Sequence, residues 1–171
     1  MTAYAALLRG VNLMGGTTLR MADHKALAEQ LGLENVRTYI ASGNLLFTSG
    51  KAEAAIKTAL EAAVKRHMSR DVAVMVRTAK ELTDMVEANP FAGEPGNKVA
   101  AIFFDEPPPP GAIEAATNIA DERLALGRRE IYVHYPSGQG RSKLNLRSKA
   151  LGTARNMNTV AKLAELAREM R

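Results

Sequence analysis

The chain has 171 residues, a net charge of +5, a pI near 9.6 and a hydrophobic fraction of 46%, which is ordinary for a globular protein. It contains no cysteine, which excludes disulfides, thiolate metal sites, cysteine-ligated iron–sulfur clusters and cysteine nucleophiles. No apolar run approaches the ~20 residues that span a bilayer, and Arg9 interrupts the apolar stretch that a signal peptide would need, so we expect a cytoplasmic protein.

The first half of the chain alternates strand-like and helix-like apolar patterns. Ile56, Leu60 and Val64 recur every four residues and form the apolar stripe of an amphipathic helix. The expected elements are a strand over 2–9, a helix over 21–31, strands over 36–40 and 45–48, a helix over 52–68 and a strand over 71–76. This β-α-β-β-α-β order predicts a ferredoxin-like lobe, in which two split βαβ units form one antiparallel sheet.

The second half begins with a capping box, in which Thr78 and Glu81 satisfy the first backbone N–H groups of a helix that Asn89-Pro90 ends. The elements expected after it are a strand over 98–104, a helix over 113–119, hairpin strands over 123–126 and 130–135, a short helix over 143–151 and a final helix over 160–170. We therefore predict an α+β fold of two ferredoxin-like (split βαβ) lobes with antiparallel sheets. Residues 1–77 form the first lobe, and residues 78–171 form a second α+β lobe packed against it.

Two polar segments lie near the ends of the chain: Arg9–Gly16 follows the first strand, and Thr153–Thr159 precedes the last helix. Guanidinium groups beside asparagine amides and accessible backbone N–H groups suit an anion. The glycines of the first segment do not match the G-x-G-x-x-G fingerprint of dinucleotide sites. They equally suit turns with positive φ, in which case Arg9 pairs with a carboxylate.

Arg155 lies close to the N-terminus of the last helix, where the helix dipole disfavours a cation. Its guanidinium therefore needs a negative partner, and we expect it to face outward toward a bound anion. A buried Asp or Glu is the alternative. Asn156, Asn158 and Thr159 are all competent N-caps, so capping and an internal ion pair also explain this segment.

The segment Ser42-Gly43-Asn44 joins two expected strands and offers a hydroxyl and an amide at a hairpin tip. Turn chemistry accounts for these residues without a ligand. Asn12 can share one ligand-binding site with Ser42 and Asn44 only if the first loop and the hairpin lie close together in the fold.

Residues 136–143 end like a phosphate-binding loop, but Tyr135 stands where the P-loop needs its first glycine and Arg141 replaces its lysine. A nucleoside triphosphatase is therefore disfavoured. The basic side chains of Arg141, Lys143, Arg147 and Lys149 suit non-specific contacts to phosphate.

The remaining signatures of function are absent from the sequence. The three histidines are scattered and lack metal-ligand spacing, so we expect no metal and no cofactor. The RNP motif of RNA-recognition modules is missing. This counts against base-specific RNA binding by a ferredoxin-like sheet, although exposure of Phe47, Tyr132 and Tyr135 would offer rings for stacking.

Several motifs converge on one family. They are Leu7-Leu8-Arg9-Gly10-Val11-Asn12, Ser42-Gly43-Asn44, Asn89-Pro90-Phe91, and Thr153-Ala154-Arg155-Asn156-Met157-Asn158-Thr159-Val160 with Leu163. In this order and spacing, from Tyr4 to the final helix, the chain resembles the bacterial family called domain of unknown function 1697. The family usually has threonine at position 154 and often an aromatic residue at position 157. The resemblance implies a two-lobe α+β fold and no particular activity.

The sequence favours a binding protein for an anionic ligand, either a phosphate-bearing small molecule or a nucleic acid. The residues expected to contact it are Arg9, Asn12, Ser42, Asn44, Arg155 and Asn156. One alternative is a metal-independent enzyme that acts on a small phosphorylated or carboxylated substrate in a cleft between the lobes. Another is a self-assembling module without a ligand. No catalytic signature decides among them.

Overall fold

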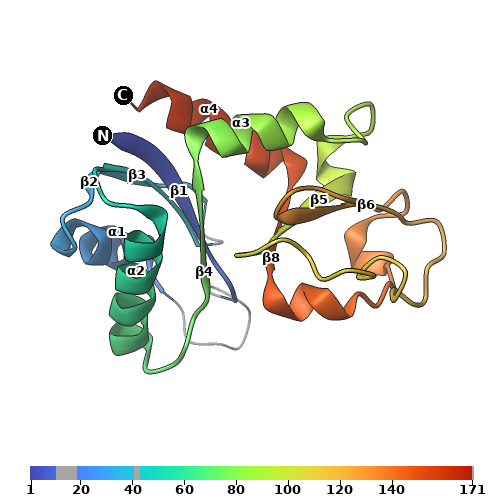
Figure 1. The fold of residues 1–171 in the computed structure, drawn as a ribbon, viewed down its shortest axis with the longest axis horizontal. Helices are drawn as coiled ribbons and strands as arrows, with labels where there is room; N and C mark the ends of the chain where they lie inside the picture. The colour runs from blue at the N-terminus through green and yellow to red at the C-terminus, as the bar shows by residue number, and fades with distance from the viewer. Residues whose placement is uncertain (11–18, 41–42, 171) are drawn as a thin grey trace. The chain divides into compact units, whose positions relative to one another are not determined.

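The computed structural model describes residues 1–10, 19–40 and 43–170 (Figure 1). The chain forms two compact units: Met1–Leu82 with Leu163–Arg171, and Thr83–Lys162. The boundaries between the units fall inside helices α3 (Ala79–Ala88) and α4 (Met157–Glu169). Each unit contains a four-stranded antiparallel sheet, which confirms the predicted α+β class with two lobes.

The sheet of the first unit has the strand order β2-β3-β1-β4, which is the ferredoxin-like order. Its elements are β1 (Thr2–Leu8), α1 (Met21–Gln30), β2 (Glu34–Thr38), β3 (Asn44–Ser49), α2 (Glu53–Met68) and β4 (Val74–Thr78). Helices α1 and α2 lie on the same face of this sheet (Figure 1). Every element predicted for this part of the chain is present, with ends that differ by at most three residues.

Alternation along the strands of the first unit directs one row of side chains into the core beneath α1 and α2. Tyr4 of β1 and Phe47 of β3 are register partners, and their rings stack with centroids 5.8 Å apart. Ile56, Leu60 and Val64 of α2 are at most 1% exposed and cover this row. Burial of each such side chain stabilises the fold by about 1.5–3 kcal/mol, so the predicted stripe is what anchors α2.

The second unit repeats the strand order of the first. Its strands are β5 (Val99–Phe103), β6 (Arg123–Leu126), β7 (Glu130–His134) and β8 (Thr153–Asn156), arranged as β6-β7-β5-β8. Counted from the first strand of each unit, the two orders are the same. The connections differ, because the described residues 104–122 and 135–152 form turns and short 3-10 segments where the first unit has α-helices.

The helices predicted over 113–119 and 143–151 are therefore wrong. Thr117 and Asn145 exchange two backbone hydrogen bonds of 2.9 Å, which join the two connections as an isolated β-bridge. Asn118 has a φ of 58°, a left-handed conformation that a right-handed helix does not contain. In the second connection, helical geometry is limited to the 3-10 segments Gln139–Arg141 and Arg147–Leu151.

The capping box predicted at the start of α3 is confirmed. The Glu81 backbone N–H donates to Thr78 Oγ1 at 3.1 Å, and the Thr78 backbone N–H donates to Glu81 Oε1 at 3.0 Å. These reciprocal bonds satisfy donors that the first helical turn leaves without intrahelical partners.

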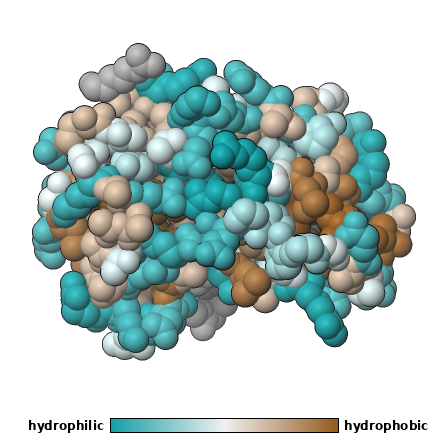
Figure 2. Space-filling model, in the orientation of Figure 1, coloured by the Kyte–Doolittle hydropathy of each residue, from teal (hydrophilic) through white to brown (hydrophobic). Residues whose placement is uncertain are grey.

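Hydrophilic residues cover most of the face seen in Figure 2, with smaller hydrophobic areas between them. Among the described residues, the large hydrophobic side chains that are exposed are Met1, Met21, Ile40, Ile119, Leu126 and Leu151. In the described part of the chain, no helix has the length and apolar character needed to cross a bilayer.

Candidate functional site

Three segments that are far apart in the sequence meet at one end of the first unit's sheet. The Leu8 backbone N–H donates to Gly43 O, and the Arg9 backbone N–H donates to Ala73 O, both at 2.9 Å. Arg70 completes the junction, because its Nη2 donates to Gly10 O at 2.9 Å. We call Arg9, Gly10, Gly43, Arg70 and Ala73 the Arg9 cluster.

The Arg9 cluster joins two motifs that the sequence presented separately, the segment after the first strand and the hairpin segment. Arg9 itself is exposed, and no ion pair connects it to any other described residue. Arg70 is half-buried beside it and was not predicted; its only sequence signal is a basic residue just after the end of α2. The predicted site residues Asn12 and Ser42 lie outside the described residues.

Asn44 forms turn hydrogen bonds, which is the alternative to ligand binding that the sequence analysis gave for this segment. It is 1% exposed, and its Nδ2 donates to Tyr39 O at 3.1 Å, while its own carbonyl accepts the Tyr39 backbone N–H at 3.2 Å. These bonds tie the first residue of β3 to Tyr39, and the neighbouring Gly43 has a φ of 80°. Asn44 thus fixes the backbone of the hairpin that contributes to the Arg9 cluster.

Arg155 lies in the second unit, and the prediction that it faces outward is wrong. It is 8% exposed because β8 pairs with β5 and sets Arg155 opposite Ala101 in the sheet. Its Nη1 donates to Thr153 Oγ1 at 2.6 Å and to Ala154 O at 2.9 Å. Burial lowers the pKa of Arg155 to about 10, so the guanidinium remains charged at neutral pH.

Asn156 caps the final helix. Its side-chain oxygen accepts the Thr159 backbone N–H at 2.9 Å, so Asn156 is the residue among the three candidate caps that fills this role. The helix begins at Met157, three residues earlier than predicted.

The second unit contains a histidine cluster that the sequence did not predict. His134 is buried and stacks on Phe91, with ring centroids 5.7 Å apart. Arg123 Nη2 lies 3.0 Å from His134 Nδ1, which therefore acts as the acceptor, and His134 Nε2 faces Glu94 Oε2 at 3.6 Å. Arg123 also lies over the Phe91 ring at 5.2 Å and reaches Glu94 Oε1 at 3.4 Å. These four side chains partner one another, which favours a structural role.

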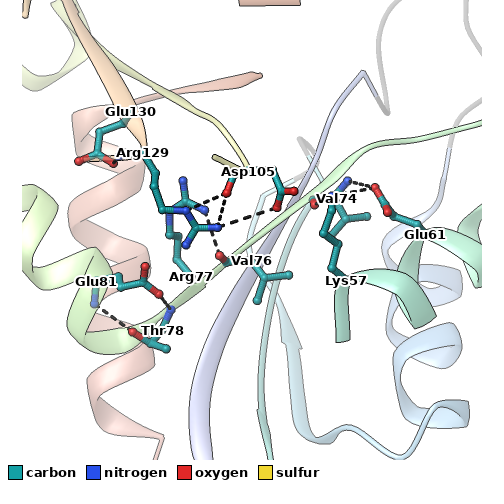
Figure 3. A network of polar contacts seen from close by, with 10 residues as sticks. All are labelled: Lys57, Glu61, Val74, Val76, Arg77, Thr78, Glu81, Asp105, Arg129 and Glu130. Atoms are coloured by element: carbon teal, nitrogen blue, oxygen red, sulfur yellow. Dashed lines mark hydrogen bonds and ion pairs between the residues drawn. The ribbon is translucent and has the colours of Figure 1, made fainter. Parts of the chain in front are cut away.

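Further polar contacts join neighbouring elements within each unit (Figure 3). In the first unit, Lys57 Nζ donates to Glu61 Oε2 at 3.0 Å and to Val74 O at 2.8 Å. The Val74 backbone N–H also donates to Glu61 Oε2 at 3.1 Å, so these bonds connect α2 to the start of β4. In the second unit, Arg129 donates through Nε and Nη2 to Asp105 O at 2.9 and 2.6 Å.

The structure also bears on two other classes of ligand, stacked RNA bases and metal ions. Phe47, Tyr132 and Tyr135, the aromatic residues that could have offered rings for base stacking, are at most 4% exposed. A flat stacking surface for RNA bases is therefore not formed by them. Across the described ranges, no group of three or more metal-ligating side chains is found.

The two sheets therefore define a two-unit α+β protein in which each unit has the same strand order, counted from its own first strand. The chain belongs to the family described as protein of unknown function (DUF1697), whose family model matches residues 1–132. The family predicted from the motifs is therefore confirmed.

A conserved bacterial protein, SP0830 from Streptococcus pneumoniae, has a similar structure over 97% of this chain and 98% of its own, with 25% sequence identity and a TM-score of 0.82. An unknown protein from Galdieria sulphuraria aligns over 98% of this chain and 92% of its own, but its TM-score of 0.29 and 13% identity support no argument. No match to a curated protein was found.

Proposed function

We propose that the protein binds a phosphate-bearing anion at the Arg9 cluster. The observation that supports this most strongly is the hydrogen bond from the Leu8 backbone N–H to Gly43 O, which brings the exposed Arg9, the next residue along the chain, to the same end of the sheet as Gly43. Asn12, two positions after Gly10, and Ser42, directly before Gly43, add an amide and a hydroxyl to the proposed set of ligand contacts.

The chemistry of the cluster suits phosphate. A guanidinium presents a planar fork of donors that pairs with phosphate oxygens in a bidentate way. Arg70 adds a second positive charge, and its Nη2 is already fixed on Gly10 O. Gly10 and Gly43 have φ values of 68° and 80°, a conformation that glycine adopts without a steric penalty because it has no Cβ. Arg155 is buried and plays no part in this proposal.

The experiment is a binding titration with ATP and with a fluorescent single-stranded oligonucleotide at several salt concentrations. We expect Arg9→Ala to weaken binding about tenfold and to reduce the slope of log K against log salt by about 0.7 for the oligonucleotide, because one phosphate contact is lost. Arg128→Ala is the matched control, since Arg128 is also exposed but lies in the second unit. Equal affinity and salt slope for Arg9→Ala and the parent protein would refute the proposal.

A further inference from the structure

The second unit contains a hollow of about 610 Å³, which is lined by two of the basic residues expected to contact phosphate non-specifically, Arg141 and Lys143. One wall is the segment 118–122, which precedes β6, and the other is formed by residues of the segment 135–143, which follows β7. Ser137 Oγ donates to Asp121 Oδ2 at 2.6 Å and links the two walls. The volume lies within the range of about 300–1,000 Å³ that is typical of small-molecule sites.

Glu122 supplies a buried carboxylate to this hollow. It is 7% exposed, and its oxygens accept the Ala120 backbone N–H only at 3.3 and 3.4 Å, which is long for a bond to a charged acceptor. No cation among the described residues pairs with it. A carboxylate has about four acceptor positions and buried polar groups are normally satisfied, so Glu122 retains capacity for a donor from outside the chain.

Tyr135 lines the hollow together with Glu122 and is 4% exposed. Burial raises the pKa of the Tyr135 hydroxyl, and the negative charge of Glu122 raises it further. The phenol therefore stays protonated at neutral pH. This adds a polar group beside the carboxylate without adding a second negative charge.

The opposite charge lies on the more exposed part of the lining. Arg141 and Lys143 both border the hollow and are exposed, and neither forms an ion pair with another described residue. The hollow thus has a carboxylate, Glu122, in its buried lining and two cations in its exposed lining. Asp121 also lines the hollow and is exposed, and its carboxylate keeps its negative charge while it accepts the Ser137 hydroxyl, so the cations outnumber the anion in the exposed lining by one.

We propose that this hollow binds a small zwitterion, namely an amine that also carries a phosphate or a carboxylate group. The ammonium group lies against Glu122 and donates to its open acceptor positions, and the anionic group pairs with Arg141 and Lys143. A ligand of one charge sign satisfies only one side of the hollow and leaves the other without a partner. This site is distinct from the Arg9 cluster and does not depend on it.

The test compares two zwitterions with two probes that carry charge of a single sign. Phosphoethanolamine and β-alanine carry both charges, ethyl phosphate lacks the amine, and ethanolamine lacks the phosphate. We expect at least one zwitterion to bind the full chain about tenfold or more tightly than either single-charge probe, with amide NMR shifts in 118–122 and 137–143. The stronger of the two zwitterions identifies phosphate or carboxylate as the anionic group. Zwitterions that bind no better than single-charge probes, or shifts that fall elsewhere, would overturn the proposal.

Two variant pairs test the assigned contacts. Glu122→Gln should weaken zwitterion binding about tenfold and leave ethyl phosphate unaffected, whereas Glu114→Gln, at an exposed glutamate outside the hollow, should change neither. Arg141→Ala should weaken both the zwitterion and ethyl phosphate, and Arg147→Ala should weaken neither. Unchanged zwitterion affinity in Glu122→Gln contradicts the proposal. If that variant fails to fold, the probe series on the parent protein decides.

Discussion

Protonation of His24 should destabilise the first unit as the pH falls from 6.5 to 4. His24 lies in α1, is 3% exposed, and its Nε2 has no hydrogen-bond partner among the described residues. Burial lowers the pKa of His24 from 6.5 to about 4, because the charged imidazolium loses its hydration inside the core. The imidazole is therefore neutral in the folded protein at pH 6.

The direction in which pH changes the free energy of unfolding follows from proton binding at His24. Between pH 6.5 and pH 4 the unfolded chain binds a proton at His24 and the folded chain does not, so the free energy of unfolding decreases as the pH falls. At about 1.4 kcal/mol per pKa unit, the loss reaches about 3 kcal/mol by pH 4. The contribution is fully present above pH 6.5.

The assay is urea unfolding of the parent protein and of His24→Leu at several pH values, followed by circular dichroism. Leucine is apolar and favours a helix, so the variant should be at least as stable as the parent protein at low pH and should lose less stability on acidification. His67→Gln is the control, because His67 is the exposed histidine of this unit. If His24→Leu and the parent protein lose stability in parallel between pH 6.5 and pH 4, the account of His24 is wrong.

Two further predictions concern stability at neutral pH. Thr78→Ala should lower the free energy of unfolding by about 1 kcal/mol in urea titrations, because it removes the N-cap bond to Glu81, and Thr78→Ser should retain most of the stability. Gly152→Ala should cost about 2 kcal/mol or more, since a Cβ there would lie 2.5 Å from Phe103 O and 2.9 Å from Ile102 Cγ2. Gly93→Ala, with no atom within 4 Å of the added Cβ, should stay within about 0.5 kcal/mol of the parent, and equal losses at both glycines would contradict this reasoning.

The first unit could be predicted well because its signals are local. The spacing of Ile56, Leu60 and Val64 specifies a helix with one apolar face, and Thr78 and Glu81 mark a helix start at fixed spacing. In each case the residues that decide the structure lie within a few positions of one another.

The second unit was less predictable because its decisive contacts are distant in sequence. Residues Thr153–Asn156 are mostly polar, which is typical of a loop, and they form a strand only because β5 offers them an edge. The same pairing buries Arg155, which the sequence placed on the surface. The apolar residues around Ile113 suit a helix locally, but the bridge between Thr117 and Asn145 and the left-handed Asn118 prevent it.

In the candidate sites, too, the residue types could be recognised from the sequence, but the contacts between distant segments could not. The Arg-Gly and Ser-Gly-Asn segments could be singled out by their residue types, whereas their meeting depends on the register of β1 and β3. Glu122 gave no signal, because it stands between Asp121 and Arg123 in a stretch that is typical of a solvated surface. Only tertiary structure reveals that its carboxylate is buried in a hollow.

The most direct measurement of phosphate binding at the Arg9 cluster is an NMR titration of the full chain with inorganic pyrophosphate. Our account predicts saturable shifts of the backbone amides of Arg9, Gly10 and Gly43 and of the Arg70 side chain, all of which disappear at high salt. Pyrophosphate that leaves these four signals in place, while the protein remains folded, would contradict it.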